Sequence, residues 1–237
     1  RDGESTNTTL EIGYEYWGSG QMTASEYGSV ASAFSLAIQQ EIDEFVANNS
    51  LPQDWVEPKI AVQIGQAGEA SPGSEHGSSD VQNDVVIAEF NTDEAAAVDA
   101  VVGHYYARNG FEAINTNEWV FRRLDAWSND GKFGDLEHHI TEWNVSARQA
   151  TEYGLESASM IAHIFAEFIE RGVDSAVVWP VQQNTVTSLS WNEGTTDLTF
   201  AGETFRIFGE NLIGTSLNWK SIKSDFGGFL YESETHE

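Results

Sequence analysis

Short apolar stretches alternate along the chain with longer segments in which apolar residues recur every three or four positions. The short stretches predict five strands, over residues 9–15, 59–65, 98–106, 136–143 and 172–182. The longer segments predict amphipathic helices over residues 24–48, 81–97, 117–127 and 154–171. Because a helix lies between each strand and the next, the pattern predicts βαβ units and an α/β fold with a parallel sheet.

Two of the predicted helices have recognisable ends. Thr23 and Glu26 fit a capping box in front of the helix over 24–48. Arg171 and Gly172 fit the end of the helix over 154–171, since Gly is favoured just past a helix C-terminus. The Gly- and Ser-rich stretch 66–80 has no apolar period and predicts a loop.

The character of the chain changes after residue 183. Residues 187–202 have the pattern of a hairpin-like pair of strands, and residues 203–219 begin an element that turns toward β structure. The residues from Glu232 onward are polar and predict a frayed tail. We therefore expect a β-rich extension with a polar tail over residues 184–237, separate from residues 1–183.

Acidic residues dominate the charged positions. The 237 residues include 38 acids and 11 bases, which gives a formal net charge of −27. Such a charge repels phosphates, so it argues against nucleic acid and against an anionic membrane as partners. It favours a solvated, salt-tolerant surface. The chain also lacks Cys, which excludes disulfides and thiolate metal sites.

The start of the chain and its apolar runs bear on where the protein acts. The chain opens with Arg1-Asp2-Gly3 rather than with Met or a signal peptide, and we interpret it as a piece of a longer, secreted or extracellular bacterial protein. It holds no apolar run of about 18 residues, the length that a membrane-spanning helix needs. Acidic loops offer oxygen ligands for Ca²⁺, but neither an EF-hand nor a nonapeptide repeat is present. No cofactor, no metal ion and no particular oligomeric state is predicted.

Polar and aromatic residues gather where the predicted strands end. In parallel α/β folds, ligands bind beyond the carboxyl ends of the strands. The residues at these ends are Glu15, then Gln63, Gly65 and Gln66, then His104, Tyr105 and Tyr106, then Glu142, Trp143 and Asn144, and finally Trp179 and Gln182. The eight Trp and seven Tyr of the chain fit either a sugar site, in which flat rings stack on sugars, or an aromatic core.

Two of these strand ends carry a Glu followed by an aromatic residue, Glu15 and Glu142. Glycoside hydrolysis needs two carboxyl groups, one protonated to serve the leaving oxygen and one ionised. Packing against Tyr14, Tyr16 and Trp17 would strip water from Glu15, which suits the acid. A neighbouring Tyr or His would keep Glu142 ionised. The alternative is that Glu15 is only a solvated residue at a strand tip.

The stretches "LEIGYEYWGSGQMTASEYGSVASA", "VVGHYY" and "HHITEWNVS" resemble motifs of the retaining (β/α)8-barrel glycoside hydrolases of clan A. The motifs are most similar to those of the α-L-arabinofuranosidase and β-xylosidase-like families. In that pattern, the first stretch is the acid/base strand with Glu-Tyr-Gly on the next helix, the second carries His and Tyr, and the third is the nucleophile strand. The resemblance covers about residues 9–183 and implies a partial TIM (β/α)8 barrel, strands 4 to 8, over residues 1–183.

The resemblance also implies roles for single residues. Glu15 would be the acid/base and Glu142 the nucleophile, with carboxyl groups about 5–5.5 Å apart, as retaining chemistry requires. His104 and Tyr106 would line the sugar subsite, and one of the tyrosines would hydrogen-bond the nucleophile. Trp179 would be a sugar platform. Further candidate substrate-binding residues are Tyr14, Trp17, Trp143 and Gln182.

The expected function is retaining hydrolysis of glycosidic bonds in plant or algal polysaccharide fragments, with an oligo- or polysaccharide as substrate. One departure from the family pattern concerns Tyr14, because the family has an Asn there that contacts the sugar 2-hydroxyl. A second is that the first strand corresponds to barrel strand 4, so we expect this chain to be the C-terminal part of a larger enzyme. These departures motivate an alternative, a non-catalytic carbohydrate-binding or inactive barrel remnant.

Overall fold

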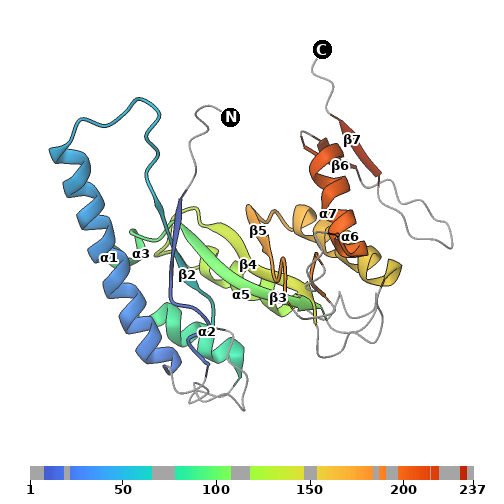
Figure 1. Ribbon diagram of the computed structural model, residues 1–237. Coiled ribbons are helices and arrows are strands. Elements are labelled where there is room, and N and C mark those ends of the chain that lie inside the picture. The colour runs from blue at the N-terminus through green and yellow to red at the C-terminus, as the bar shows by residue number, and fades with distance from the viewer. Residues whose placement is uncertain are drawn as a thin grey trace. The chain divides into compact units, whose positions relative to one another are not determined.

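The structure is a computed structural model (Figure 1). It describes residues 8–18, 22–65, 78–107, 118–146, 154–183, 187–190, 197–213, 215–218 and 230–233. The predicted loop over 66–80 therefore lies outside the described residues except at its end, and so does most of the predicted polar tail. Within the described residues, no helix is long and apolar enough to cross a membrane.

A five-stranded sheet has the strand order of the chain, β1–β2–β3–β4–β5. Its strands are β1 (Thr9–Ile12), β2 (Lys59–Gln63), β3 (Ala100–Ala107), β4 (Glu137–Val145) and β5 (Ser175–Val178). The pairs β1–β2 and β2–β3 are parallel. β3 and β4 also run in the same direction, because backbone hydrogen bonds join Glu137 to Asp99 at one end and Ser146 to Ala107 at the other.

Helices follow the strands, as the apolar periods predict. They are α1 (Ala24–Asn48), α2 (Ser79–Ala88), α3 (Thr92–Ala95), α5 (Glu118–Ser128) and α6 (Leu155–Glu170). The capping box of Thr23 and Glu26 is confirmed, and Gly172, with φ 69°, lies just past Arg171, the C-cap of α6. Together with the sheet, these helices confirm an α/β fold of the partial (β/α)8-barrel kind.

One predicted helix is two helices in the structure. The segment 81–97 is divided at Asn91, whose side chain accepts hydrogen bonds from the N–H groups of Asp93 and Glu94 and so starts α3. An Asn at this position is a strong N-cap, because its side chain satisfies backbone donors that the helix leaves unpaired. The local cap outweighs the continuous apolar pattern.

Two strands are shorter than predicted. β1 ends at Ile12 rather than at residue 15, and the chain turns away at Gly13, which has φ 86°. β5 covers only Ser175–Val178 of the predicted 172–182. It starts after Gly172 has ended α6 and stops before Pro180, which has no N–H to offer a strand partner.

The segment after residue 183 differs from the sequence-based expectation. An antiparallel bridge joins Ser190 to Leu198, in keeping with a strand pair, although residues 191–196 lie outside the described residues. The expected turn to β structure from residue 203 is wrong at its start, because helix α7 (Phe200–Asn211) occupies this stretch. Only β6 (Thr215–Asn218) and β7 (Leu230–Ser233), an antiparallel pair, come after it.

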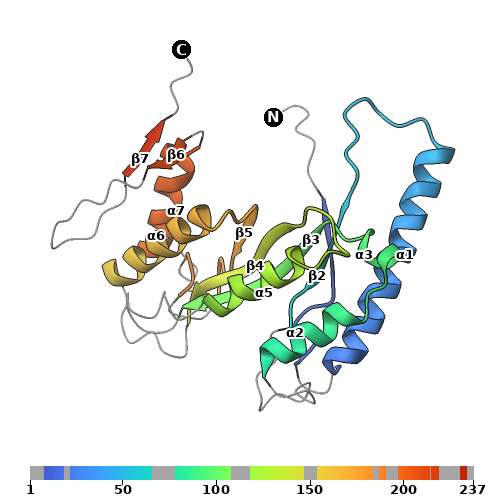
Figure 2. The same ribbon diagram turned by 180° about the vertical axis from the view of Figure 1, so that it is seen from behind.

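Aromatic side chains explain why α7 forms. Thr199 caps its first turn by accepting the N–H of Gly202. Phe208 stacks on Phe165 of α6, with ring centroids 4.7 Å apart, so the two helices lie side by side, as Figure 2 also shows. The Phe residues of this stretch thus follow a helical rather than a strand period.

The chain consists of two compact units, residues 1–103 with 119–139, and residues 104–118 with 140–237. The first unit buries apolar side chains of β2, α2 and α5 such as Ile60, Val86 and Trp127. The second unit buries Ile161, Ile164 and Phe168 of α6. The domain boundary after residue 183 stays a prediction.

Candidate functional site

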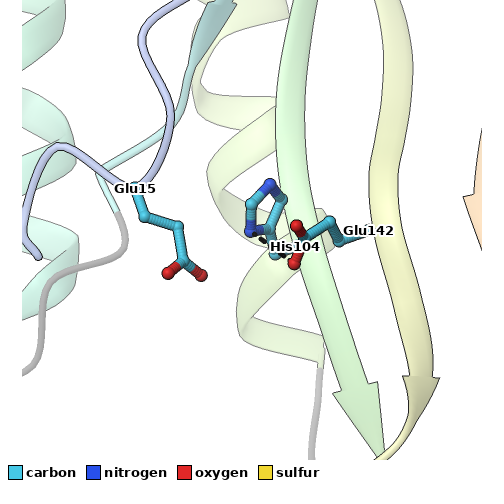
Figure 3. Close-up of side chains that lie close together, drawn as sticks. All are labelled: Glu15, His104 and Glu142. Atoms are coloured by element: carbon cyan, nitrogen blue, oxygen red, sulfur yellow. Dashed lines mark ion pairs between the residues drawn. The ribbon is translucent and has the colours of Figure 1, made fainter. Parts of the chain in front are cut away.

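Glu15 lies in the first unit, on the loop that follows β1 (Figure 3). Its backbone has φ 41°, in the left-handed region that residues with a side chain rarely adopt. Its carbonyl accepts the N–H of Gly18 at 2.7 Å, which closes a tight turn. The left-handed conformation costs about 1–2 kcal/mol in an L-residue. Such strain concentrates at functional sites, which favours a working role for Glu15 over that of a solvated strand tip.

The three aromatic residues around Glu15 have different environments. Tyr16 is buried and stacks on Tyr27 of α1, with ring centroids 4.3 Å apart and rings nearly parallel. Trp17 packs edge-on against Tyr16 at 5.2 Å. Tyr14 is 56% exposed. Of the three aromatic residues expected to pack around Glu15, Tyr16 therefore lies in the core. The two predicted substrate-binding residues, Tyr14 and Trp17, remain accessible.

Glu142 lies in the second unit, in the middle of a cluster formed by β3 and β4. The hydroxyl of Tyr106 donates to Glu142 Oε2 at 2.7 Å. Nδ1 of His104 lies 3.6 Å from the same oxygen, as the dashed line in Figure 3 marks. His104 and Tyr106 share one face of β3 because side chains two positions apart on a strand point the same way. The structure thus contains the tyrosine–carboxylate hydrogen bond that the resemblance implied.

This cluster holds a carboxylate in a place from which water is nearly excluded. Glu142 is only 8% exposed and His104 only 1% exposed. A buried carboxylate needs donors to replace the water it loses, and the Tyr106 hydroxyl is such a donor. A buried carboxylate that accepts a tyrosine hydroxyl is held in a fixed orientation, as a nucleophile requires.

The opposite faces of the same strands pack against helices. Tyr105 and Trp143 alternate with the cluster residues, and each makes an edge contact with Phe168 of α6 at 5.1 Å. The Tyr105 hydroxyl donates to Glu167 at 2.9 Å, and burial raises the pKa of that carboxyl. Trp143 was predicted to bind substrate, but its side chain is 1% exposed and lies in this packing layer. It is not part of the cluster around Glu142.

Asn144 connects β4 to the segment after β5, which carries the candidate substrate-binding residues Trp179 and Gln182. Its side-chain N–H₂ donates to the carbonyls of Trp179 and Thr187, each at 2.9 Å. Trp179, which precedes a cis bond to Pro180, is 44% exposed, as a sugar platform would be. Gln182 is exposed and forms a bridge with Ser190. The sequence already hinted at Asn144, since it lies two positions after Glu142 and therefore on the same face.

Glu142 and His104 also have the chemistry of metal ligands. Zinc sites in proteins use at least three side chains. Among the described residues of the second unit, no third His, Asp or Glu joins this pair closely enough to complete such a site. That the function requires no metal ion stays a prediction.

Comparisons with known proteins give little further guidance. No family model matches the chain, and no curated protein matches it. Among solved structures, the chain is similar to the crystal structure of the GH39 enzyme from Xanthomonas axonopodis pv. citri, with 13% sequence identity and a TM-score of 0.43. The match covers 84% of this chain and 51% of that one, so the chain spans about half the length of that structure. A likeness at this level does not identify a function.

Proposed function

We propose that this chain carries the catalytic residues of a retaining glycoside hydrolase, with Glu142 as the nucleophile and Glu15 as the acid/base. The observation that carries the proposal is the contact between the Tyr106 hydroxyl and the buried Glu142 carboxylate, with His104 beside it. The left-handed backbone of Glu15 supports its part in the reaction. The motif order along the chain, acid/base before His and Tyr before nucleophile, supports it as well.

The chemistry has two balanced steps. In the first, Glu142 attacks the anomeric carbon, and the bond to the leaving oxygen breaks as Glu15 gives that oxygen its proton. In the second, Glu15 takes a proton from water, the water oxygen attacks the anomeric carbon, and Glu142 leaves as a carboxylate. Each step inverts the configuration of the anomeric carbon. Two inversions leave the product with the configuration of the substrate.

The neighbouring residues have supporting parts in this proposal. Tyr106 holds Glu142 in the orientation for attack, because its hydroxyl donates to one oxygen of the carboxylate. His104 lines the same subsite. Trp179 would stack on a sugar ring, and Tyr14, Trp17 and Gln182 would add stacking and hydrogen bonds. Trp143 has only a packing role in this arrangement.

The substrates that we propose are oligo- or polysaccharide fragments of plant or algal origin, cleaved in the manner of an α-L-arabinofuranosidase or a β-xylosidase. The motifs around Glu15, His104 and Glu142 support this class. The excess of acids over bases fits work outside a bacterial cell in a salty medium. The proposal includes no cofactor.

A panel of nitrophenyl glycosides, given to the full-length protein, tests the activity and identifies the sugar. The Glu142→Gly variant should lose turnover and, with azide and an activated substrate, form a glycosyl azide of inverted configuration. The Glu15→Ala variant with azide should form a glycosyl azide of retained configuration. Glu44→Ala, an exposed position on α1, is the control and should keep full activity. Folded Glu142→Gly protein that shows no rescue would contradict the assignment of the nucleophile.

A second candidate function is carbohydrate binding without cleavage. Tyr14 favours it, because this exposed residue stands where the resembled families have an Asn that contacts the sugar. Titration calorimetry separates the two functions. Tight binding of a sugar, with no turnover by the full-length protein on any glycoside, would support the binding function, whereas turnover that requires Glu142 would exclude it.

A further inference from the structure

Tyr27, in the first turn of α1, lies at the point where β1 separates from β2. The register of these parallel strands places Thr9 opposite Lys59 and Ile12 opposite Val62. At the start of the pair, the Lys59 N–H donates to the Thr8 carbonyl at 2.9 Å. Parallel ladders repeat every two residues. Two such steps bring the Gln63 N–H to the Ile12 carbonyl, which would bond directly in a regular ladder.

The Tyr27 hydroxyl occupies that place in the ladder. It accepts the Gln63 N–H at 2.7 Å and donates to the Ile12 carbonyl at 2.7 Å. The side chain is 2% exposed, and burial raises the pKa of the hydroxyl, so that it stays protonated as a donor. Both backbone groups remain satisfied although the two strands no longer bond to each other. This insertion explains why β1 ends at Ile12.

The Tyr27 ring also fixes the chain on both sides of Glu15. On one side, a Cβ at Gly13 would come within 2.7 Å of Tyr27 Cε2, so only glycine fits against the ring there. On the other side, Tyr16 stacks on the same ring, with 2° between the ring planes. Glu15 lies between these two contacts. Its backbone position relative to β1 and α1 therefore depends on Tyr27.

We propose that Tyr27 is a positioning residue for Glu15, and that its hydroxyl ends β1 at the residue from which the loop delivers the Glu15 carboxyl for proton transfer. The inference rests on the proposed function. Tyr27 acts through Glu15, because its hydroxyl touches only the backbone of Ile12 and Gln63 among the contacts described. Without that hydroxyl, the Gln63 N–H and the Ile12 carbonyl can bond directly, which draws Gly13 toward β2 and moves Glu15.

The Tyr27→Phe variant tests the inference, because it keeps the stacked ring and deletes the hydroxyl. Aryl glycosides with a poor leaving group need proton donation, whereas dinitrophenyl glycosides do not. General acid catalysis contributes about 10²–10⁴-fold. We expect kcat/KM to fall at least about 10-fold for the poor leaving group and less than about 2-fold for the dinitrophenyl glycoside. An equal loss on both substrates, or no loss on either, would overturn the proposal.

Tyr105→Phe is the matched control, since it deletes another largely buried tyrosine hydroxyl, the one that donates to Glu167 in the helix-packing layer. It should leave the ratio of the two kcat/KM values unchanged. Crystal structures of the wild-type and Tyr27→Phe proteins provide a readout that does not depend on activity. The variant structure should show a direct bond between the Gln63 N–H and the Ile12 carbonyl, and a Glu15 displaced from its wild-type position. An unmoved loop would overturn the positioning role, whereas a wild-type protein inactive on every glycoside would defeat only the proposed function.

Discussion

Tyr106 and Glu142, on neighbouring strands β3 and β4, are joined by a 2.7 Å hydrogen bond from the tyrosine hydroxyl to the carboxylate. Because each strand fixes the direction of its side chain, the bond is set by the sheet rather than by a loop. The bond fixes the orientation of the proposed nucleophile. It also provides the most direct mutational test.

The Tyr106→Phe variant should be folded but slow. Hydrogen bonds to charged groups contribute about 1.5–3 kcal/mol, and about 1.4 kcal/mol corresponds to a factor of ten in rate. We therefore expect kcat/KM on the best glycoside to fall by about 10- to 100-fold. Initial rates with the full-length protein measure the loss. Tyr105→Phe on the same strand is the control, and a Tyr106→Phe protein as active as wild type would argue against this role for the bond.

The pattern along the sequence was sufficient to predict a parallel α/β sheet, whereas the grouping of His104, Tyr106 and Glu142 was implied by the resemblance of their motifs to a known family. Strand–helix alternation implies parallel strands, and period-two alternation places His104 and Tyr106 on one face of their strand, whereas the packing of the next strand decides that Glu142 meets them. The same alternation places Trp143 opposite Glu142, so its position in the packing layer was also present in the pattern, although the aromatic character of Trp143 suggested a sugar contact.

Other features depend on contacts between distant residues and could not be read from a local pattern. β1 stops at Ile12 because a hydroxyl from α1 enters the ladder, which requires the helix to be in place. Helix α7 forms because Phe208 meets Phe165 of another helix. Tyr27 belongs to the Glu-Tyr-Gly motif that the sequence shares with the resembled families. The motif does not reveal its hydrogen bonds to the backbone of Ile12 and Gln63.

Asn144 should be important for both stability and substrate binding. The Asn144→Ala variant leaves the carbonyls of Trp179 and Thr187 without the donor they share. Loss of a partner for a buried polar group costs about 1–3 kcal/mol. The free energy of unfolding, measured in urea, should therefore decrease by this amount. If Trp179 is a sugar platform, KM should rise more than kcat falls.

Asn211→Ala is the control for that experiment. Asn211 makes a similar side-chain bond, to the Ile207 carbonyl at 2.8 Å, but at an exposed helix end. Its loss should change the free energy of unfolding by no more than about 0.5 kcal/mol, as is usual for surface positions. Equal effects of the two variants would indicate that Asn144 does not hold the Trp179 segment.

Gly13 should tolerate no side chain. The Gly13→Ala variant places a Cβ within 2.7 Å of the Tyr27 ring at a residue with φ 86°. The left-handed backbone alone costs about 1–2 kcal/mol for a residue other than glycine. We expect at least that loss in urea unfolding, together with lower activity because the loop carrying Glu15 must shift. At Gly131, a Cβ would meet nothing within 4 Å, so Gly131→Ala should be nearly neutral.

The ion pair between Lys59 and Glu137 should make the free energy of unfolding depend on pH in the acidic range. The hydrogen bond from Lys59 is the main cause that lowers the pKa of Glu137 below its usual value, and a bond with His139 adds to it. A carboxyl whose pKa is lower in the folded state stabilises the fold above its unfolded pKa, about 4.3. This contribution is lost as the pH falls through the lower, folded pKa.

The Glu137→Gln variant should therefore be less stable than wild type at pH 7, and the difference should shrink steadily as the pH falls below about 4. Urea unfolding at a series of pH values measures it. Glu44→Gln, at an exposed position on α1, is the control and should follow the wild-type pH dependence closely. A difference between Glu137→Gln and wild type that stays constant down to the lowest pH would show that the ionised carboxylate of Glu137 does not stabilise the fold. The bond to Lys59 would then be one that the neutral amide replaces equally well.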